Sequence, residues 1–429
     1  MATKQTNSWI SALMGMTALL VASINAQAFE SMKMGDWDVA ISGNVNAFWT
    51  NIDCDTNGNG LVSSGLACGS LVSSDYKSGN VQTGLLPSWF GLNAKQESNG
   101  LKTEINIGFQ PGVDSGGGAI DTGLRLNSEN LRQVNIKFGA DWGMLTLGRD
   151  LGVYGSDAIL SDMTLLGVGT VSDLAVFGGN TTLGRIGVGY LYADWKAQIQ
   201  YASPNWDGFS FNVAIVDPWA PVNLSGLSLD QNSFSQDADT YGFEGKGAYT
   251  WGDDTSTTTG KVWAGFISQS LDTSSTSFSN QDATGFDVGG KVAFSGLELV
   301  GYFYSGDGIG TLGFMWDGLD TSGATRDSDG FYVQGTYKFP DVGTKVGISF
   351  GESNLDLGPG DTATGGICDP VTSAACTLVE TNESFVIGVY HPVTPSLNLV
   401  FEYTKTEATA HNGNSAEEST IALGAILFY

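Results

Sequence analysis

The feature that most constrains the fold is a repeating unit of about ten residues in which apolar and polar side chains alternate. In residues 101–110, for example, apolar side chains such as Ile105 fall on one face and charged ones such as Glu104 on the other. Successive side chains of a strand point to opposite sides. A core strand would not keep so many charges inside, whereas a membrane barrel strand has one lipid face and one wet face. The alternation therefore predicts an all-β transmembrane barrel.

The units are separated by connections that are alternately long and short, which predicts antiparallel pairing. Counting eight long loops and seven short turns gives about sixteen strands, an even number as in single-chain bacterial barrels. We expect long external loops, and short periplasmic turns at Asn99, Gly139 and Asp341. The expected strands are 39–49, 88–97, 101–110, 131–138, 144–149, 184–203, 209–216, 241–251, 261–269, 285–294, 296–304, 331–339, 344–351, 384–390, 396–405 and 420–429.

The last eleven residues, STIALGAILFY, keep the alternation up to the aromatic Tyr429. We interpret them as the strand that closes the ring against the first one, with its apolar face toward lipid. Aromatic residues near other strand ends, such as Trp142 and Trp251, predict girdles at the two membrane interfaces. A soluble sandwich core would also use such aromatics, but a chain of this length would need two domains and a linker, and no linker is visible.

The N-terminus has the pattern of a secretory signal peptide over residues 1–28. Lys4 provides a basic start, 10–24 are mostly apolar, and 26–28 form a small-x-small cleavage site. We expect a mature chain from Phe29, with 29–429 forming one barrel domain. Removing residues 1–28 deletes one basic and no acidic residue, so the net charge changes from -27 to -28. Such a charge disfavours nucleic acid as a partner and, with export, indicates a Gram-negative outer membrane.

Four cysteines form two local pairs in stretches rich in small polar residues. Cys54 precedes Cys68, and Cys368 precedes Cys376. Export to an oxidising compartment favours two disulfides, each within one loop. Metal binding is the alternative, and only two histidines exist to support it.

Residues 55–62, DTNGNGLV, resemble the first half of a calcium loop, with oxygen donors at Asp55, Asn57 and Asn59. The twelfth position is Leu66, where a bidentate glutamate is expected. A solvated surface loop explains the segment more simply. The sequence contains no nucleophile elbow and no zinc-type histidine spacing, so we expect no enzyme, no metal and no cofactor.

Three segments carry a resemblance to the Gram-negative trimeric porin family: TLGRDLGVYG (146–155), AVFGGN (175–180) and YASPNWDGFSFNVAI (201–215). The resemblance implies a homotrimer whose third loop folds into the barrel and narrows it. Phe177, Gly178 and Gly179 would form the tip of that loop. Glycines there allow close approach to the barrel wall.

The same resemblance implies a constriction with basic and acidic sides. Arg149 matches a family position that lines it, and the alternation of 184–203 would point Arg185 inward. If a bulge shifts that register, Lys196 takes the inward place. Asp162 and Asp173 are the acidic candidates of the inserted loop. The family's usual acidic residues at the loop tip are Val176 and Asn180 here, and a second-strand position that often carries an inward arginine in the family is Trp89. Both sides of the field are therefore thinned.

These observations predict a water-filled channel for passive diffusion of small hydrophilic solutes and ions, with a modest cation preference from the net acidic charge. A solute-specific channel with the same fold stays open, as does a surface adhesin or structural barrel without conductance. Expected partners are outer-membrane lipids and lipopolysaccharide. The acidic clusters 253–254, 327–329 and 417–418 are most simply solvated charges, and bridging to lipopolysaccharide by divalent cations is the alternative.

Overall fold

The computed structural model describes residues 31–58, 61–68, 74–113, 131–171, 181–224, 241–253, 255–272, 280–320, 322–371 and 376–429. Two short helical segments, α2 (Ser156–Ser161) and η1 (Met163–Leu166), lie in one loop. No helix in these ranges is long and apolar enough to cross a membrane. The strands are β1 (Met32–Met34), β2 (Trp37–Asp55), β3 (Tyr76–Gln82), β4 (Trp89–Ser98), β5 (Leu101–Phe109), β6 (Leu131–Ala140), β7 (Gly143–Leu151), β8 (Trp195–Ala202), β9 (Phe209–Val216), β10 (Gly242–Trp251), β11 (Thr258–Leu271), β12 (Gln281–Phe294), β13 (Leu297–Asp307), β14 (Asp327–Lys338), β15 (Lys345–Leu355), β16 (Val379–Pro392), β17 (Leu397–Ala410) and β18 (Ser415–Phe428).

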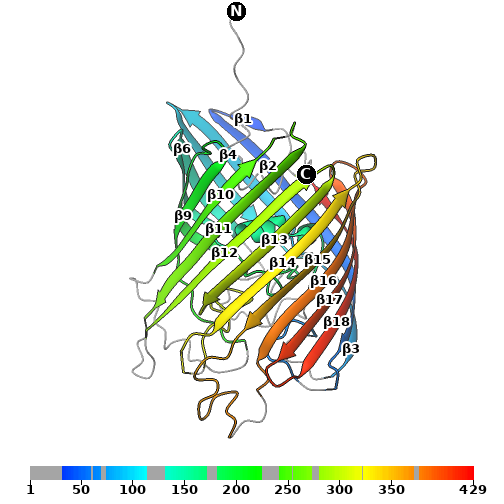
Figure 1. The fold of residues 1–429 in the computed structure, drawn as a ribbon. Coiled ribbons are helices and arrows are strands. Elements are labelled where there is room, and N and C mark those ends of the chain that lie inside the picture. Colours follow the sequence, from blue (N-terminus) through cyan, green and yellow to red (C-terminus); the bar gives the residue numbers. More distant parts are fainter. Residues whose placement is uncertain are drawn as a thin grey trace, which may run out of the picture.

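These strands form one closed antiparallel sheet, and Figure 1 shows the resulting barrel. β18 pairs with β2 from Phe428 opposite Asn44 to Glu417 opposite Asp55, which closes the ring as predicted. β3 and β4 pair with successive halves of β2 and together fill one place in the wall. β1 is a three-residue strand at the edge, so the described wall has sixteen strands.

The short turns and the C-terminus lie at one end of the barrel, and the long external loops lie at the other (Figure 1). Two of the short turns need backbone angles that few residues adopt. Asn99 and Gly100 have φ of 54° and 77°, and Ser295 and Gly296 have 48° and 86°. Positive φ at both central residues is the signature of the type I′ turn, which matches the twist of paired strands.

The outer face of the wall is apolar and ends in aromatic residues. Exposed apolar side chains lie on nearly every strand, such as Ile105, Ile136 and Ile348. Near the periplasmic ends, Trp142 stacks on Tyr201 at 6.4 Å between ring centroids. The predicted girdle is thus present at this end of the barrel.

Three details of the wall differ from the sequence prediction. The expected strand 184–203 begins only at Trp195, because positive φ at Gly187 and Gly189 turns the preceding segment into the barrel. β3 lies within a stretch expected to be loop. The last outer connection, expected to be long, is a four-residue turn at 411–414, because β17 and β18 continue pairing to Thr409 opposite Ser415.

Four connections enter the outer half of the barrel and pack against one another there. They are the linker 83–88 between β3 and β4, the described parts of the inserted loop (152–171 and 181–194), 217–224 after β9, and 308–326 between β13 and β14. Their apolar side chains, Trp219, Leu312 and Trp316 among them, form the largest buried cluster. The predicted inward-folded third loop is present, and loop 308–326 joins it, which the sequence reading did not foresee.

Candidate channel constriction

The inner face of the wall is polar at the level of the inserted loop. Asn106, Asn135 and Gln200 are buried there. Asn106 Nδ2 donates to Asn135 Oδ1 at 3.0 Å, so neighbouring strands share a ladder of side-chain amides. A polar inner face is what a water-filled barrel requires.

Three wall carboxylates hold the inserted loop by its main chain. Glu244 on β10 accepts from the amides of Val153 (2.6 Å) and Tyr154 (3.0 Å). Asp287 on β12 accepts from Gly155 N at 3.1 Å. Glu402 on β17 accepts from Val168 N (2.7 Å) and Gly169 N (2.8 Å). All three carboxylates are nearly inaccessible to solvent. The loop is therefore fixed at both ends of its first described part, across strands distant in sequence.

A second set of contacts ties α2 to lysines on the wall. Lys246 on β10 lies 2.7 Å from Asp157 and donates to Ser156 Oγ at 2.8 Å. Lys261 on β11 also pairs with Asp157. Burial raises the pKa of the Asp157 carboxyl, but the two lysines outweigh it, so the pKa lies well below its usual range.

Lys196, one of the two alternatives for an inward basic residue, lies on β8 and is 1% exposed. It forms an ion pair with Glu244, the carboxylate that holds the start of the inserted loop. Its ammonium also lies 6.0 Å from the ring centroid of Trp219 and 5.9 Å from that of Phe314. Lys196 is thus a buried support of the loop.

Arg185 lies in the returning part of the inserted loop and is fully buried, not on a strand as expected. Its Nη1 donates to Ser384 O on β16 at 3.0 Å. Asp162, the acidic candidate, caps η1 by accepting from Thr164 N at 2.9 Å and also accepts from Tyr190 OH at 2.9 Å. Both residues are occupied in fixing the loop against the wall.

Arg149 lies on β7, with Val134 and Ala197 as its partners on the adjoining strands, and its Nε atom is buried. Its place in the constriction stays a prediction. Asp173, Phe177, Gly178 and Gly179 lie outside the described residues. The structure therefore places Arg185 and Asp162 in the inserted loop, close enough to interact electrostatically, and Lys196 on the wall beside that loop.

The sequence reading missed the lysines on the lumen side of other strands. The alternation of buried and exposed positions places several there, including Lys137, Lys246, Lys261, Lys291 and Lys345. It also missed the inward carboxylates Glu244, Asp287 and Glu402. The available signal was a charged residue in phase with small or polar inward positions of a predicted strand.

The first disulfide anchors the connection between β2 and β3 (residues 56–75), called loop 1 below, to the wall. Cys54 lies within β2 and bonds to Cys68, so the pairing is confirmed, but the bridge is not confined to a loop. Cys68 N also donates to Glu418 Oε2 on β18 at 3.1 Å. The same loop pairs with loop 356–378, where Ser63 N donates to Thr377 O at 2.7 Å.

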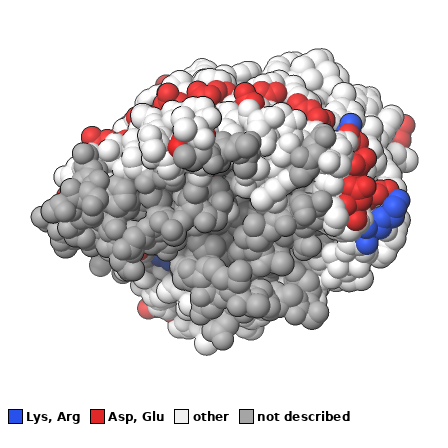
Figure 2. Space-filling view, turned by 90° about the horizontal axis from the view of Figure 1, so that it is seen from below, with Lys and Arg blue, Asp and Glu red and all other residues white. Residues whose placement is uncertain are grey.

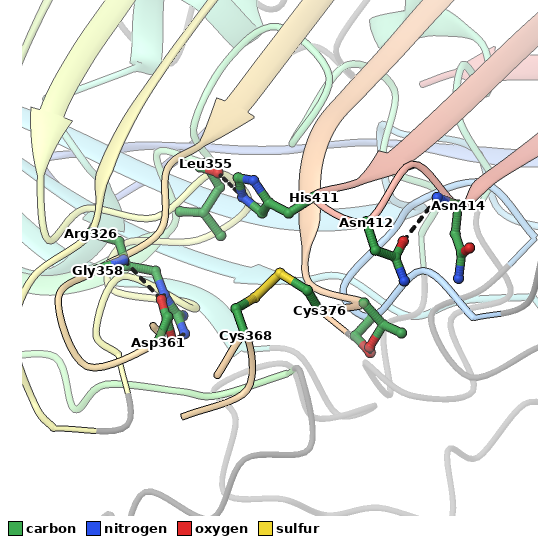
Figure 3. The surroundings of a disulfide bond; sticks show 11 residues. Arg326, Leu355, Gly358, Asp361, Cys368, Cys376, His411, Asn412 and Asn414 are labelled. Atoms are coloured by element: carbon green, nitrogen blue, oxygen red, sulfur yellow. Dashed lines mark hydrogen bonds and ion pairs between the residues drawn. A yellow bond between two sulfur atoms is a disulfide. The ribbon is translucent and has the colours of Figure 1, made fainter. Parts of the chain in front are cut away.

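The second disulfide, Cys368 with Cys376, joins two points of loop 356–378 as predicted. Figure 3 shows it between the Arg326–Asp361 pair and the turn that carries His411. Arg326 donates through Nε and Nη2 to both carboxylate oxygens of Asp361, each at 2.7 Å, which ties loop 308–326 to loop 356–378. The outer loops thus form one interlocked layer.

The calcium candidates are only partly described. Asp55 Oδ1 accepts from Asn57 N at 2.7 Å, and Asn57 Nδ2 donates to Ser415 Oγ at 3.0 Å, while Asn59 lies outside the described residues. Within the part of the chain that is described, no group of three or more His, Cys, Asp and Glu side chains is arranged to hold a metal ion.

Carboxylates form a row along the outside of the barrel near its outer end. Glu352 lies opposite Glu383, which lies opposite Glu407, and the row continues through Glu417 to Asp55. Their strand positions share the exposed face with Ile348 and Phe385. Figure 2, viewed from the outer end, shows acidic side chains along much of the rim and basic ones at a few places.

A closed sixteen-strand barrel with a polar inner face, an apolar outer face and an inserted loop defines an outer-membrane channel protein. A family model described as Gram-negative porin matches residues 15–411, so the chain belongs to that family and to the outer membrane. No curated protein sequence matches the chain.

Solved structures share the fold at low sequence identity. The outer membrane channel DcaP of Acinetobacter baumannii is 13% identical over 94% of this chain and 100% of its own, with a TM-score of 0.59. An anion-selective porin from Comamonas acidovorans is 12% identical over 92% and 100%, with a TM-score of 0.58. The OmpT protein of Vibrio cholerae, described in a trimer form, is 14% identical over 92% and 100%, with a TM-score of 0.53.

Proposed function

We propose that this porin forms a water-filled channel for passive diffusion of small hydrophilic solutes and ions. The observation that carries the proposal is the polar inner face of the barrel, together with the inserted loop that wall carboxylates hold in place. Catalysis is not part of the proposal. Residues 1–28 act as an export signal in it, and the mature barrel domain spans 29–429.

The channel prefers cations modestly, and the preference arises at its outer mouth. Lysines and carboxylates both face the lumen, where many of them pair. The excess acidic charge lies elsewhere, and Figure 2 shows acidic side chains around the outer mouth. Such a rim raises the local concentration of cations at the entrance, more strongly at low salt.

The working form is a homotrimer that contacts itself through the strands from β4 to β9. These strands have only 8–10 residues and an apolar outer face, with exposed Ile105, Ile136 and Ile199. One structural neighbour is described as a trimer. Because strands of 9–11 residues span the hydrocarbon core, this side has little wall above the membrane, and its apolar outer face is available to a partner subunit.

The carboxylate row faces lipopolysaccharide through divalent cations. Like charges directly opposite one another destabilise a sheet, so a row across five strands needs counter-ions. Lys405, 2.9 Å from Glu417, neutralises one member. The row lies where the wall rises above its apolar band, beside the headgroups of the outer leaflet.

The test is conductance of purified trimers in planar bilayers, with reversal potentials in a potassium chloride gradient. We expect stepwise open channels, and a shift toward the cation potential that grows as salt is lowered. Arg149→Ala should strengthen that shift slightly. An absence of conductance would instead support a structural barrel. Anion selectivity would contradict the proposal that acidic charge at the outer mouth sets the ion preference.

A further inference from the structure

An apolar cavity of about 90 Å³ lies inside the barrel beside the inserted loop. The linker 83–88 borders it with Leu85 and Leu86, and loop 308–326 borders it with Leu312 and Trp316. The inserted loop contributes a third, largely aliphatic side, made of Ile159, Leu160, Leu165, Leu183 and Ile186. The lining also includes the polar residues Arg132, Thr181 and Thr182. Three segments far apart in the sequence thus present apolar side chains to one space.

The inserted loop separates its polar and apolar side chains. Asp157 and Asp162 point to the wall and to η1, where lysines, amides and Tyr190 occupy them. On the cavity side, Leu160 and Leu165 are only half-buried. An apolar group that covers these leucines removes apolar surface from water, which is favourable.

We propose that this cavity binds the apolar group of permeating solutes, and that the channel favours small zwitterionic or neutral molecules with an aliphatic side chain. The inference rests on the proposed channel function and names its preferred solute class. An aliphatic group that enters the cavity leaves water and covers the leucines, whereas an amide loses hydrogen bonds to water and finds few partners there.

The experiment is liposome swelling with leucine and asparagine, which have the same net charge and similar size. Protein-free liposomes measure leakage, and glycine reports whether the channel is open. Native protein should admit leucine roughly threefold faster than asparagine, a ratio that partial burial of a few methylene groups would produce. Glycine entry with equal leucine and asparagine rates would overturn the inference and leave the channel standing. No entry of glycine would overturn the channel function itself.

Variants assign the preference to the cavity. Leu160→Asn and Leu165→Asn should each bring the leucine-to-asparagine ratio close to one. Leu160→Met keeps an apolar side chain and should keep the preference. Val371→Asn, at an 86% exposed position in loop 356–378, is the matched control and should behave like native protein. A preserved ratio in heat-modifiable, folded Leu160→Asn and Leu165→Asn would show that the cavity does not select solutes.

Discussion

The two sides of this barrel differ in height and in what they support. Strands β4 to β9 have 8–10 residues, while β11 to β18 have 11–14. A tilted strand of 9–11 residues is enough to span the hydrocarbon core, so the longer strands continue above it. The tall side carries the carboxylate row, and it also holds most anchors of the inserted loop. The short side is thus about as tall as the hydrocarbon core, whereas the tall side adds wall and carboxylates above it.

The largest effect should come from the ion pairs that anchor the inserted loop to β10 and β11. Asp157→Asn removes the partner of two buried lysines, which should lower the free energy of unfolding by about 3–5 kcal/mol. The inserted loop should then become a site of trypsin cleavage. Chemical unfolding followed by tryptophan fluorescence, and digestion in detergent, measure the two effects. Lys137→Gln breaks a pair with Asp150 on the short side and should leave the loop resistant.

The same anchor predicts a pH dependence. Because the pKa of Asp157 is lower in the folded protein, its pairing contributes full stability above the unfolded value of about 4. That contribution is lost as pH falls through the lower folded value. Native protein should therefore lose this contribution below about pH 4, and Asp157→Asn should show a smaller dependence in this range. Equal pH profiles for the two proteins would contradict the role of the carboxylate.

The next largest effect should differ between the outer face of the short side and that of the tall side. Ile136→Arg on β6 should disrupt trimers, because an arginine in an apolar membrane-level surface costs about 2–4 kcal/mol. Ile348→Arg on β15 places the same change on the tall side, where it should leave the oligomer intact. Native gels and light scattering report the outcome. Loss of trimers only with Ile348→Arg would move the interface to the tall side.

A smaller effect should distinguish the two disulfides. Replacing Cys54 and Cys68 with serine frees loop 1 from β2 and should lower the free energy of unfolding by about 2–3 kcal/mol. The pair Cys368 and Cys376 closes a shorter segment within one loop, so its replacement should have less effect. Both variants should insert into the membrane and conduct. Failure of either to insert would reveal a role in folding.

The smallest effect concerns the carboxylate row. Chelating divalent cations should lower the melting temperature of native protein, because opposed carboxylates then repel. The double substitution of Glu383→Gln and Glu407→Gln should reduce the loss of stability on chelation by about 0.5–1 kcal/mol. The effect is small because each opposed pair contributes only a few tenths of a kcal/mol. Calorimetry with and without magnesium measures it. An unchanged response to chelation would remove the row as the cation-binding surface.

Local sequence was sufficient for the wall but not for the constriction. The alternation in residues 101–110 reflects lipid on one side and water on the other, a requirement that acts on each strand separately. Residues 184–192 show the same alternation, which predicts a strand, but they form part of the inserted loop. Gly187 and Gly189 turn that segment inward, and nothing local separates such an apolar loop from a strand.

The sequence by itself determined a closed barrel with alternately long and short connections and two disulfides, because alternation, turn residues and cysteine spacing are local. Tertiary structure decided the partners of Arg185, Lys196 and Asp162, and the aliphatic lining of the cavity. Glu244 meets Val153 across 91 positions of the chain, and Glu402 meets Val168 across 234. A contact between residues so far apart leaves no local pattern, because its energy depends on where the closed wall places each side chain.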